Sequence, residues 1–262
     1  MSVPTTAERF AALHRPGRPL LLPNAWDHAS AVALARAGFA AVGTTSLGVA
    51  AAAGLPDAAC ATREQTLALA RSLTGLDVPV TVDIEGGFGG TPAQVTELVA
   101  ELAGAGVAGV NLEDGRGTGL AAVAAQAELI GEIKTRVPGV FLNARTDAFW
   151  LGVPEARAEA LARVRAYAGA GADGVFVPGA ADGGDVEPLV CAAGVPLNVL
   201  VQPGVPVERL AAMGVARISF GSLLFRAALH AAVTTALEVS RGLPPACGIP
   251  SYEAVQALHR HG

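Results

Sequence analysis

Three acidic residues, Asp83, Glu85 and Glu113, occur at the ends of two consecutive apolar runs in the sequence. Residues two apart in a β-strand point to the same side, so Asp83 and Glu85 are expected to share a face. Carboxylates that gather in one place repel one another unless a cation or protons compensate for their charge. With no histidine or cysteine beside them, these oxygen ligands favour Mg²⁺, or Mn²⁺, over zinc. The pattern predicts a divalent metal site; the alternative is a set of solvated loop acids or ion-pair partners of Arg116 and Arg145.

Groups suited to binding an anion follow two other apolar runs. Arg145 ends one of them, and its guanidinium could bind a carboxylate or a phosphonate through two parallel hydrogen bonds. The Thr-Thr-Ser segment at residues 44–46 leads into a turn that contains glycine, where hydroxyl and N–H groups could hold an anion. The alternatives are an ion pair of Arg145 with Asp147 or Glu113, and hydroxyls that only cap the next helix.

Composition excludes several other kinds of protein. The net charge of −5 argues against a nucleic-acid partner. The single lysine, Lys134, falls in a predicted helix, which disfavours a Schiff-base aldolase, and the histidines lie mostly on helices, which disfavours a zinc aldolase. The three cysteines, Cys60, Cys191 and Cys247, form no CxxC pair, which suits a reducing cytoplasm.

A repeated pattern of helix, glycine and apolar run predicts the elements that position these residues. Four glycines stand where a helix would end in a left-handed residue: Gly38, Gly106, Gly171 and Gly214. Thr62 and Gln65 predict a capping box at the start of another helix. Eight apolar runs read as buried parallel strands, at 19–24, 40–45, 79–85, 108–113, 140–145, 174–178, 196–201 and 217–221.

Eight β-α repeats in 262 residues predict a single (β/α)₈ barrel domain over 1–262. An open doubly wound sheet is the alternative, but it needs fewer strands and usually a Gly-rich phosphate loop, and no GxGxxG or Walker sequence occurs. In such a barrel the carboxyl ends of the strands meet at one end, so the acids, Arg145 and residues 44–46 are expected to converge there.

The C-terminal tail, about 222–262, reads as a long apolar helix, a breaker (LPPACGIP) and a last short helix. It could be the final barrel helix with a cap, or a contact between subunits. No uncharged apolar run is long enough to cross a bilayer, and the N-terminal segment has no signal-peptide core. We therefore expect a cytoplasmic protein with no membrane partner.

Several short motifs, in order over about residues 20–220, resemble the isocitrate lyase/phosphoenolpyruvate mutase superfamily. They are DIEGGFG at 83–89, LED at 112–114, ARTD at 144–147 and SAVALARAGFAAVGTTSLGVAAAAGLPDAA at 30–59. The resemblance implies a barrel with a C-terminal helix swapped between subunits, in a homodimer or homotetramer. It also implies Mg²⁺ held by Asp83 with the assistance of Glu85 and Glu113, and a 2-oxo or enolate carboxylate bound beside it.

The resemblance assigns further roles to individual residues. Asp57 matches a loop acid near the substrate, and it joins Arg145 and Glu113 as a catalytic candidate. The expected substrate-binding residues are Thr45, Ser46, Leu47, Arg145 and Asn198.

Two features of the superfamily are missing from this sequence. The lyases carry a catalytic cysteine in a mobile loop after the fourth strand, whereas residues 113–119 run almost directly into the next helix and contain no cysteine. The His-Ser that follows the sixth strand in mutase-type members is Pro178-Gly179 here. The chain therefore resembles a mutase-like branch without the cysteine loop, and Asp57 or Asp27 is left as a replacement for the missing acid.

The expected function is Mg²⁺-dependent cleavage or formation of a C–C bond next to the carbonyl of a small 2-oxo or 2-hydroxy carboxylate, through an enolate. One alternative is a P–C mutase or hydrolase that acts on a phosphonate such as phosphonopyruvate. The other is a non-catalytic barrel that binds carboxylates.

Overall fold

The computed structural model describes residues 4–259, and the predicted (β/α)₈ barrel is confirmed. Nine hydrogen-bonded strands run parallel to one another, in the order β1-β11-β10-β9-β8-β5-β4-β3-β2. Their bounds are β1 (Leu20–Leu22), β2 (Asn24–Ala25), β3 (Val42–Thr44), β4 (Val80–Asp83), β5 (Gly109–Glu113), β8 (Phe141–Arg145), β9 (Gly174–Phe176), β10 (Leu197–Leu200) and β11 (Arg217–Ser219).

The first predicted strand closes the barrel by changing partners at Pro23. Before the proline, β1 pairs with β11, and after it β2 pairs with β3. Proline has no N–H to donate, so it is suited to the point where one ladder stops and the next begins. Its carbonyl still accepts a hydrogen bond from the Gly43 N–H, at 2.9 Å. The two strand segments thus correspond to one predicted strand, and all eight predicted runs contain a strand.

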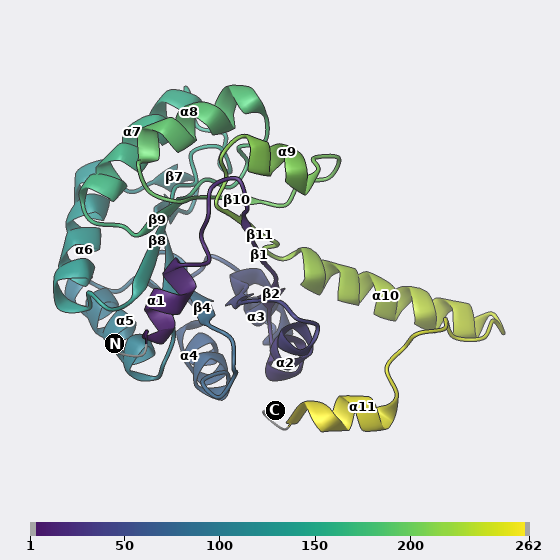
Figure 1. Cartoon of the computed structure of the whole chain (residues 1–262). Helices are drawn as coiled ribbons and strands as arrows, with labels where there is room; N and C mark the ends of the chain where they lie inside the picture. The colour runs from purple at the N-terminus through teal and green to yellow at the C-terminus, as the bar shows by residue number, and fades with distance from the viewer. Residues whose placement is uncertain (1–3, 260–262) are drawn as a thin grey trace.

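A ring of helices surrounds the strands (Figure 1). The predicted glycine ends are confirmed, because Gly38, Gly106, Gly171 and Gly214 all have positive φ. The predicted capping box at Thr62 is wrong, because its hydroxyl does not cap the helix. The helices are α2 (His28–Arg36), α3 (Ser46–Ala52), α4 (Arg63–Ser72), α5 (Pro92–Gly104), α6 (Val123–Arg136), α7 (Ala156–Gly169), α8 (Gly183–Ala193) and α9 (Val207–Ala212).

The amino-terminal end of the barrel is plugged by the short helix α1 (Thr6–Ala11). Phe10 is fully buried there, and the ring of His14 stacks on Phe141 at 4.4 Å between centroids. Burial, with a contribution from the charge of Arg217, lowers the pKa of His14 to about 3, so the imidazole is neutral. With this end filled by aromatic side chains, the opposite end is the one that can admit a ligand.

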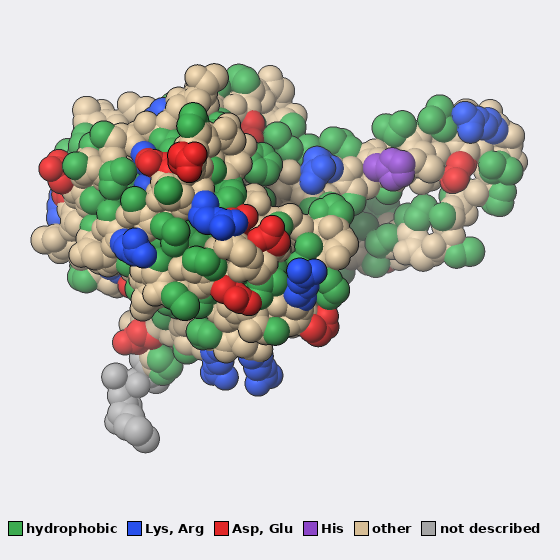
Figure 2. Space-filling model, turned by 90° about the horizontal axis from the view of Figure 1, so that it is seen from above, with side chains coloured by type: hydrophobic (Ala, Val, Ile, Leu, Met, Phe, Trp, Pro, Cys, Tyr) green, Lys and Arg blue, Asp and Glu red, His purple; other side chains and the backbone are tan. Residues whose placement is uncertain are grey.

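The C-terminal tail leaves the barrel (Figure 1). The helix α10 (Leu223–Ser240) projects away from it, and α11 (Tyr252–Gln256) with the 3₁₀ turn Ala257–His259 returns to α2. Figure 2 shows hydrophobic side chains along this arm. By length and composition alone α10 could cross a membrane, although it contains Arg226 and Glu238 and is 6% buried in the described chain. The last three residues of the predicted tail lie outside the described residues.

Candidate active site

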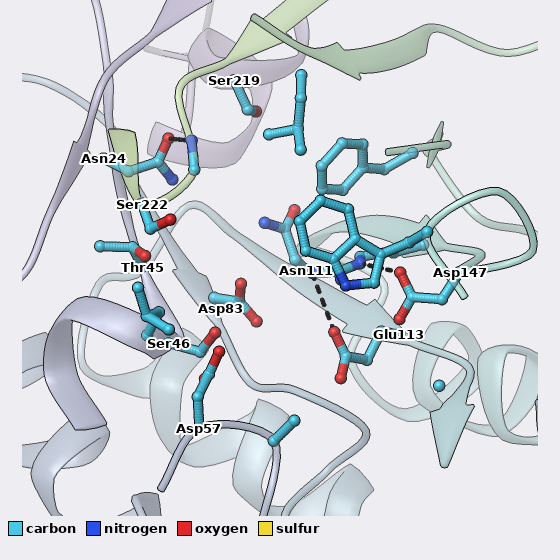
Figure 3. A pocket seen from close by; sticks show the side chains of 18 of the residues that line it. Asn24, Thr45, Ser46, Asp57, Asp83, Asn111, Glu113, Asp147, Ser219 and Ser222 are labelled. Atoms are coloured by element: carbon cyan, nitrogen blue, oxygen red, sulfur yellow. Dashed lines mark hydrogen bonds and ion pairs between the residues drawn. The ribbon is translucent and has the colours of Figure 1, made fainter. Parts of the chain in front are cut away.

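A cavity of about 270 Å³ lies at the carboxyl ends of the strands (Figure 3). Most of the site residues predicted from the sequence line this cavity, and they come from five different elements and loops. The predicted residues that line it are Thr45, Ser46, Leu47, Asp57, Asp83, Glu113 and Arg145. Two predicted residues, Glu85 and Asn198, are absent from its wall.

The strand register explains why Asp83 and Glu113 come close. Asp83 pairs with Asn111 on β5, and Glu113, two residues further along the same face, pairs with Arg145 on β8. Burial raises the pKa of Asp83 to about 6, opposed by Arg145 and reinforced by Glu85 and Asp57. Burial also raises the pKa of Glu113, again against the effect of Arg145. The positive charge of Arg145 therefore does not fully compensate for the negative charge of these two buried carboxylates.

Arg145 lies between two acids. Its Nη1 is 3.0 Å from Glu113 Oε2, and its Nε donates to Asp147 Oδ1 at 2.6 Å. The guanidinium also lies over the ring of Phe176, 5.6 Å from its centroid. Burial opposes the charge of Arg145, but Glu113, Asp147 and Asp83 outweigh it and raise the pKa, so the group remains cationic. The alternative that the sequence left open, ion pairs with Asp147 and Glu113, is thus present, and within residues 4–259 Nη2 has no hydrogen-bond partner.

Glu85 does not share the face of Asp83, so that expectation is wrong. The strand β4 ends at Asp83, and Glu85 adopts a left-handed conformation with φ of 50°. Its buried carboxylate accepts a hydrogen bond from the Thr62 hydroxyl at 2.7 Å, which is why that hydroxyl does not cap α4. The two-residue alternation of a strand fails here because the backbone turns before it reaches Glu85.

Asn198 lies inside the barrel beneath the cavity. It is 1% exposed, and its Oδ1 accepts a hydrogen bond from the Ser219 hydroxyl at 3.1 Å. Ser219, on the neighbouring strand β11, is the residue of this pair that reaches the cavity. Asn198 is therefore placed to support the floor of the cavity.

The start of α3 brings backbone N–H groups to the cavity. Thr45 is the N-cap of α3, and its hydroxyl makes no capping bond. The N–H groups of Ser46 and Leu47, in the first helical turn, have no acceptor within the helix. The neighbouring Thr44 hydroxyl accepts from the Asp83 N–H at 2.9 Å and so ties this segment to β4. The residues that carry these hydroxyl and N–H donors, Thr45, Ser46 and Leu47, thus line the same cavity as Asp83.

The loop acids differ in position. Asp57, on the exposed loop between α3 and α4, lines the cavity beside Ser46 and Asp83 (Figure 3). Asp27 instead caps α2, where it accepts from the Ser30 N–H at 2.7 Å, and it does not line the cavity. Of the two acids, Asp57 is the one within the site.

A short hairpin follows the fourth barrel strand, where the sequence has no long cysteine-containing loop. It consists of β6 (Gly115–Arg116) and β7 (Gly119–Leu120), and Gly115 and Gly117 line the cavity. Cys60, Cys191 and Cys247 are exposed and lie outside the cavity wall. Lys134, on α6, binds Asp173 and is likewise outside the cavity wall, in agreement with the argument against a Schiff base.

Sequence reasoning missed several residues of the site. Asn111 could have been found, because it precedes Glu113 by two positions in one strand and so shares its face. Asp147 was considered only as an ion-pair partner, and Trp150 follows it in a loop with no regular pattern. The cavity-lining residues to which the sequence assigned no site role include Asn24, Asn111, Asp147, Trp150, Phe176, Leu200, Ser219 and Ser222.

The donor set of the cavity fits Mg²⁺. In the part of the chain that the structure describes, no three acidic, histidine or cysteine side chains are close enough to form a complete ligand cage. Mg²⁺ usually keeps several waters and binds through one or two carboxylates together with oxygens of the substrate. Asp83 and Glu113 supply oxygen ligands of that kind, with raised pKa values that indicate a missing positive charge.

Comparison with known proteins places this geometry in a family. A sequence model of phosphoenolpyruvate phosphomutase matches residues 10–240. An uncharacterized protein of Mycobacterium tuberculosis is 42% identical over 248 residues, 95% of each chain. The 2-methylisocitrate lyase of Bacillus subtilis is 33% identical over 180 residues, which cover 65% of this chain and 58% of the lyase.

A solved structure agrees with these matches in fold. The crystal structure of a putative lyase/mutase from Burkholderia cenocepacia superposes with a TM-score of 0.86 and 35% identity, over 96% of this chain and 94% of that one. Family match, relatives and fold agree with the motifs around Asp83, Glu113 and Arg145. The chain is therefore an enzyme of the phosphoenolpyruvate mutase/isocitrate lyase superfamily, whose members act on small carboxylates or phosphonates.

Proposed function

We propose that the protein is a Mg²⁺-dependent lyase that cleaves or forms a C–C bond next to the carbonyl of a small 2-oxo or 2-hydroxy carboxylate, through an enolate. The observation that carries this proposal is the pairing of an uncompensated carboxylate, Asp83, with a free guanidinium edge on Arg145 in one cavity. Such a site offers one region for a cation and another for an anion.

The carboxylate of the substrate binds between Arg145 and the start of α3. Nη1 and Nε of Arg145 are occupied by Glu113 and Asp147, which hold the guanidinium plane and leave Nη2 for the substrate. The N–H groups of Ser46 and Leu47 and the Thr45 hydroxyl donate from the other side. This arrangement orients the substrate before the bond breaks.

Asp83 and Glu113, the two acids of the predicted set that line the cavity, would hold the metal. When bound, Mg²⁺ stabilises the negative charge that develops when a bond beside a carbonyl breaks. Asp57, exposed at the edge of the cavity, is the acid proposed to take the place of the missing cysteine. Trp150 and Phe176 limit the access of water on the side of Arg145.

C–C chemistry is favoured over P–C chemistry by the relatives with a named activity, because 2-methylisocitrate lyases recur among them. The second candidate, a mutase or hydrolase for a phosphonate such as phosphonopyruvate, is favoured by the family model that matches the chain. The third, a carboxylate-binding barrel without catalysis, rests on the short hairpin β6–β7 in place of the lyase loop.

A panel assay distinguishes the three candidates. Release of pyruvate or glyoxylate is measured with Mg²⁺ from 2-hydroxy dicarboxylates and from phosphonates, for the wild-type protein and for D83A. Turnover of a dicarboxylate that D83A abolishes supports the lyase, and turnover of a phosphonate supports the second candidate. Absence of turnover across the panel, with tight binding of oxalate, supports the binding barrel.

We further propose that the protein assembles as a homodimer or homotetramer in which α10 packs on a neighbouring subunit. The helix exposes Leu229, Val233 and Leu237 at 51%, 60% and 48% of their surface, and solvated apolar patches of this kind mark interaction sites. A contact between subunits, rather than a bilayer, would account for the apolar composition of α10.

We also propose a cytoplasmic location. Three separate exposed thiols support a reducing compartment of this kind.

A further inference from the structure

A fully buried arginine lies inside the barrel, below the cavity. Arg217, in β11, is 0% exposed, and no acidic side chain within residues 4–259 forms an ion pair with it. A buried cation without a paired carboxylate lowers stability substantially, and apolar residues of similar volume often fill such positions at no loss. The position of Arg217 therefore needs an explanation other than packing.

Arg217 supports two residues of the cavity floor. Its Nη2 donates to Asn111 Oδ1 at 3.2 Å, and its Nε donates to the Ser219 hydroxyl at 3.0 Å. Its guanidinium also lies 5.9 Å from the centroid of the Phe10 ring, on the plugged side of the barrel. Asn111 and Ser219 both line the cavity, so Arg217 reaches the site only through them.

The hydrogen bonds at Asn111 fix the orientation of its amide. Asn111 Oδ1 accepts from Arg217 and also from Asn143 Nδ2, at 2.8 Å. An arginine can only donate, so the oxygen of Asn111 must be the atom that faces Arg217. Its Nδ2 therefore faces away from the two donors, and in the described part of the chain this nitrogen donates no hydrogen bond.

The free amide N–H of Asn111 is in the right place to meet a ligand. Asn111 is the register partner of Asp83 on the neighbouring strand and precedes Glu113 by two residues on the same strand face. In Figure 3 it lies with Asp83 and Glu113 around one space. A ligand held between Asp83 and Arg145 therefore comes within reach of this amide.

The two bonds to its oxygen make the Asn111 amide a stronger donor. Hydrogen bonds in a chain polarise one another, and here the first donor is a guanidinium. Burial lowers the pKa of Arg217 to about 9, with Asp83 opposing the shift, so the guanidinium is charged at neutral pH. A donor that is already oriented and polarised is the kind of group that stabilises a developing oxyanion.

We propose that Asn111 contacts the substrate, with its Nδ2–H donating to the oxygen on which negative charge develops, and that Arg217 is a positioning residue that acts through Asn111. The inference rests on the proposed function, because it needs a carboxylate or enolate oxygen in this cavity. It adds a third donor, from the floor of the barrel, to the donors of α3 and Arg145.

Oxalate, a stable dicarboxylate, is the probe for this contact. Its affinity is measured by titration calorimetry with Mg²⁺ for the wild type, N111A, R217M, R217K and the double variant N111A/R217M. Loss of a hydrogen bond to a charged ligand weakens binding by about 10- to 100-fold. We expect a loss in this range for N111A and for R217M, and a smaller loss for R217K, which can still donate.

The double variant separates positioning from general destabilisation. If Arg217 acts through Asn111, R217M causes no further loss of oxalate affinity once Asn111 is alanine. The matched control is T81V, which changes another buried interior residue of the barrel outside the cavity wall, and it should bind oxalate like the wild type. The melting temperature is recorded for every variant, so that N111A alone decides the question if R217M does not fold.

The outcomes distinguish this inference from the proposed function. If the wild-type protein binds oxalate and N111A binds it with the same affinity, the role of Asn111 is overturned and the proposed function stands. Additive losses in the double variant, or a loss in T81V as large as in N111A, overturn the positioning role of Arg217. A wild-type protein that does not bind oxalate with Mg²⁺ overturns the proposed function and this inference together.

Discussion

At the scale of single residues, the site depends on how Arg145 is held. Glu113 and Asp147 occupy two of its nitrogens at 3.0 and 2.6 Å, and the charge of Arg145 in turn opposes the burial that raises the pKa of both acids. A planar guanidinium can serve two protein acids and still present an edge to a ligand, which an ammonium group cannot do with the same geometry. The acids around Arg145 therefore orient it for a substrate carboxylate.

The variant R145K tests this orientation. It keeps the charge but loses the planar fork, so we expect KM for the carboxylate substrate, or the Kd for oxalate, to rise by about 10- to 100-fold. R157K is the matched control, because Arg157 is exposed and pairs with Asp185, and neither residue lines the cavity. Equal affinities of R145K and the wild type would show that the fork does not bind the ligand.

The raised pKa of Asp83 predicts how Mg²⁺ binding depends on pH. Burial raises this pKa to about 6, so between about pH 4 and pH 6 the metal-free folded chain holds a proton that the unfolded chain has lost. The free energy of unfolding of the metal-free protein therefore falls as pH rises through this window. Mg²⁺ compensates for the charge that appears, so its stabilising effect is expected to increase over the same window.

Calorimetric melting curves with and without Mg²⁺, at about pH 5 and about pH 7.5, check this prediction. The increase in Tm caused by Mg²⁺ should be larger at the higher pH, and D83N should show no increase at either. An increase that is the same at both pH values would refute the role given to Asp83.

At the scale of elements, the close approach of α3 to β2 and α10 positions the anion donors. A Cβ atom at Gly48 would lie 2.8 Å from both Thr45 Cγ2 and Trp26 Cβ, so only glycine lets the first turn of α3 sit where it does. Trp26 packs in turn on Phe225 of α10, with ring centroids 5.4 Å apart. The donors at Thr45 and Ser46 thus depend on a contact between three elements.

Replacement of Gly48 by alanine tests that dependence. Overpacking at this position is expected to cost about 1–3 kcal/mol of stability and to weaken oxalate binding, because Thr45 must move. G104A is the control, since Gly104 ends α5 with open space around it, and it should stabilise the chain by up to about 1 kcal/mol. Oxalate affinity and Tm are measured for both variants; an unperturbed G48A would contradict the positioning role of this contact.

The elements were more predictable from the sequence than the contacts between them. Buried parallel strands are short apolar runs, which here follow a glycine or a proline, so the eight runs were visible locally. The face of Glu85 was not, because the backbone turns left-handed after Asp83 and the Glu85 side chain meets the Thr62 hydroxyl, 23 residues away in sequence. Arg217 was missed for a similar reason, since its partners Asn111 and Ser219 come together only when the barrel closes.

At the scale of the whole molecule, most large apolar side chains are buried in the barrel, but Leu229, Val233 and Leu237 of the projecting helix α10 are exposed. Leu229 and Val233 are four residues apart and so lie on one face of α10, which the described chain leaves exposed. A second copy of the same chain is the proposed cover for this face. Assembly would also place neighbouring chain near the start of α10, where Ser222 lines the cavity.

Mass measurement in solution tests the assembly. The wild type should elute with the mass of a dimer or a tetramer of the 26.2 kDa chain, and the double variant L229E/V233E should shift toward a single chain. The control is A158E, which adds a negative charge at an exposed position on α7. A wild type of 26.2 kDa, or a double variant with unchanged mass, would contradict the proposal.

The measurement closest to the central claim is the exchange of the methyl protons of pyruvate in D₂O, because exchange requires an enolate whatever the natural substrate is. Proton NMR follows the loss of the methyl signal with the wild-type protein and Mg²⁺, with D83N and with buffer alone. The account predicts exchange above the buffer rate that depends on Mg²⁺ and is lost in D83N. A rate equal to that of buffer, or one that D83N leaves unchanged, would contradict it.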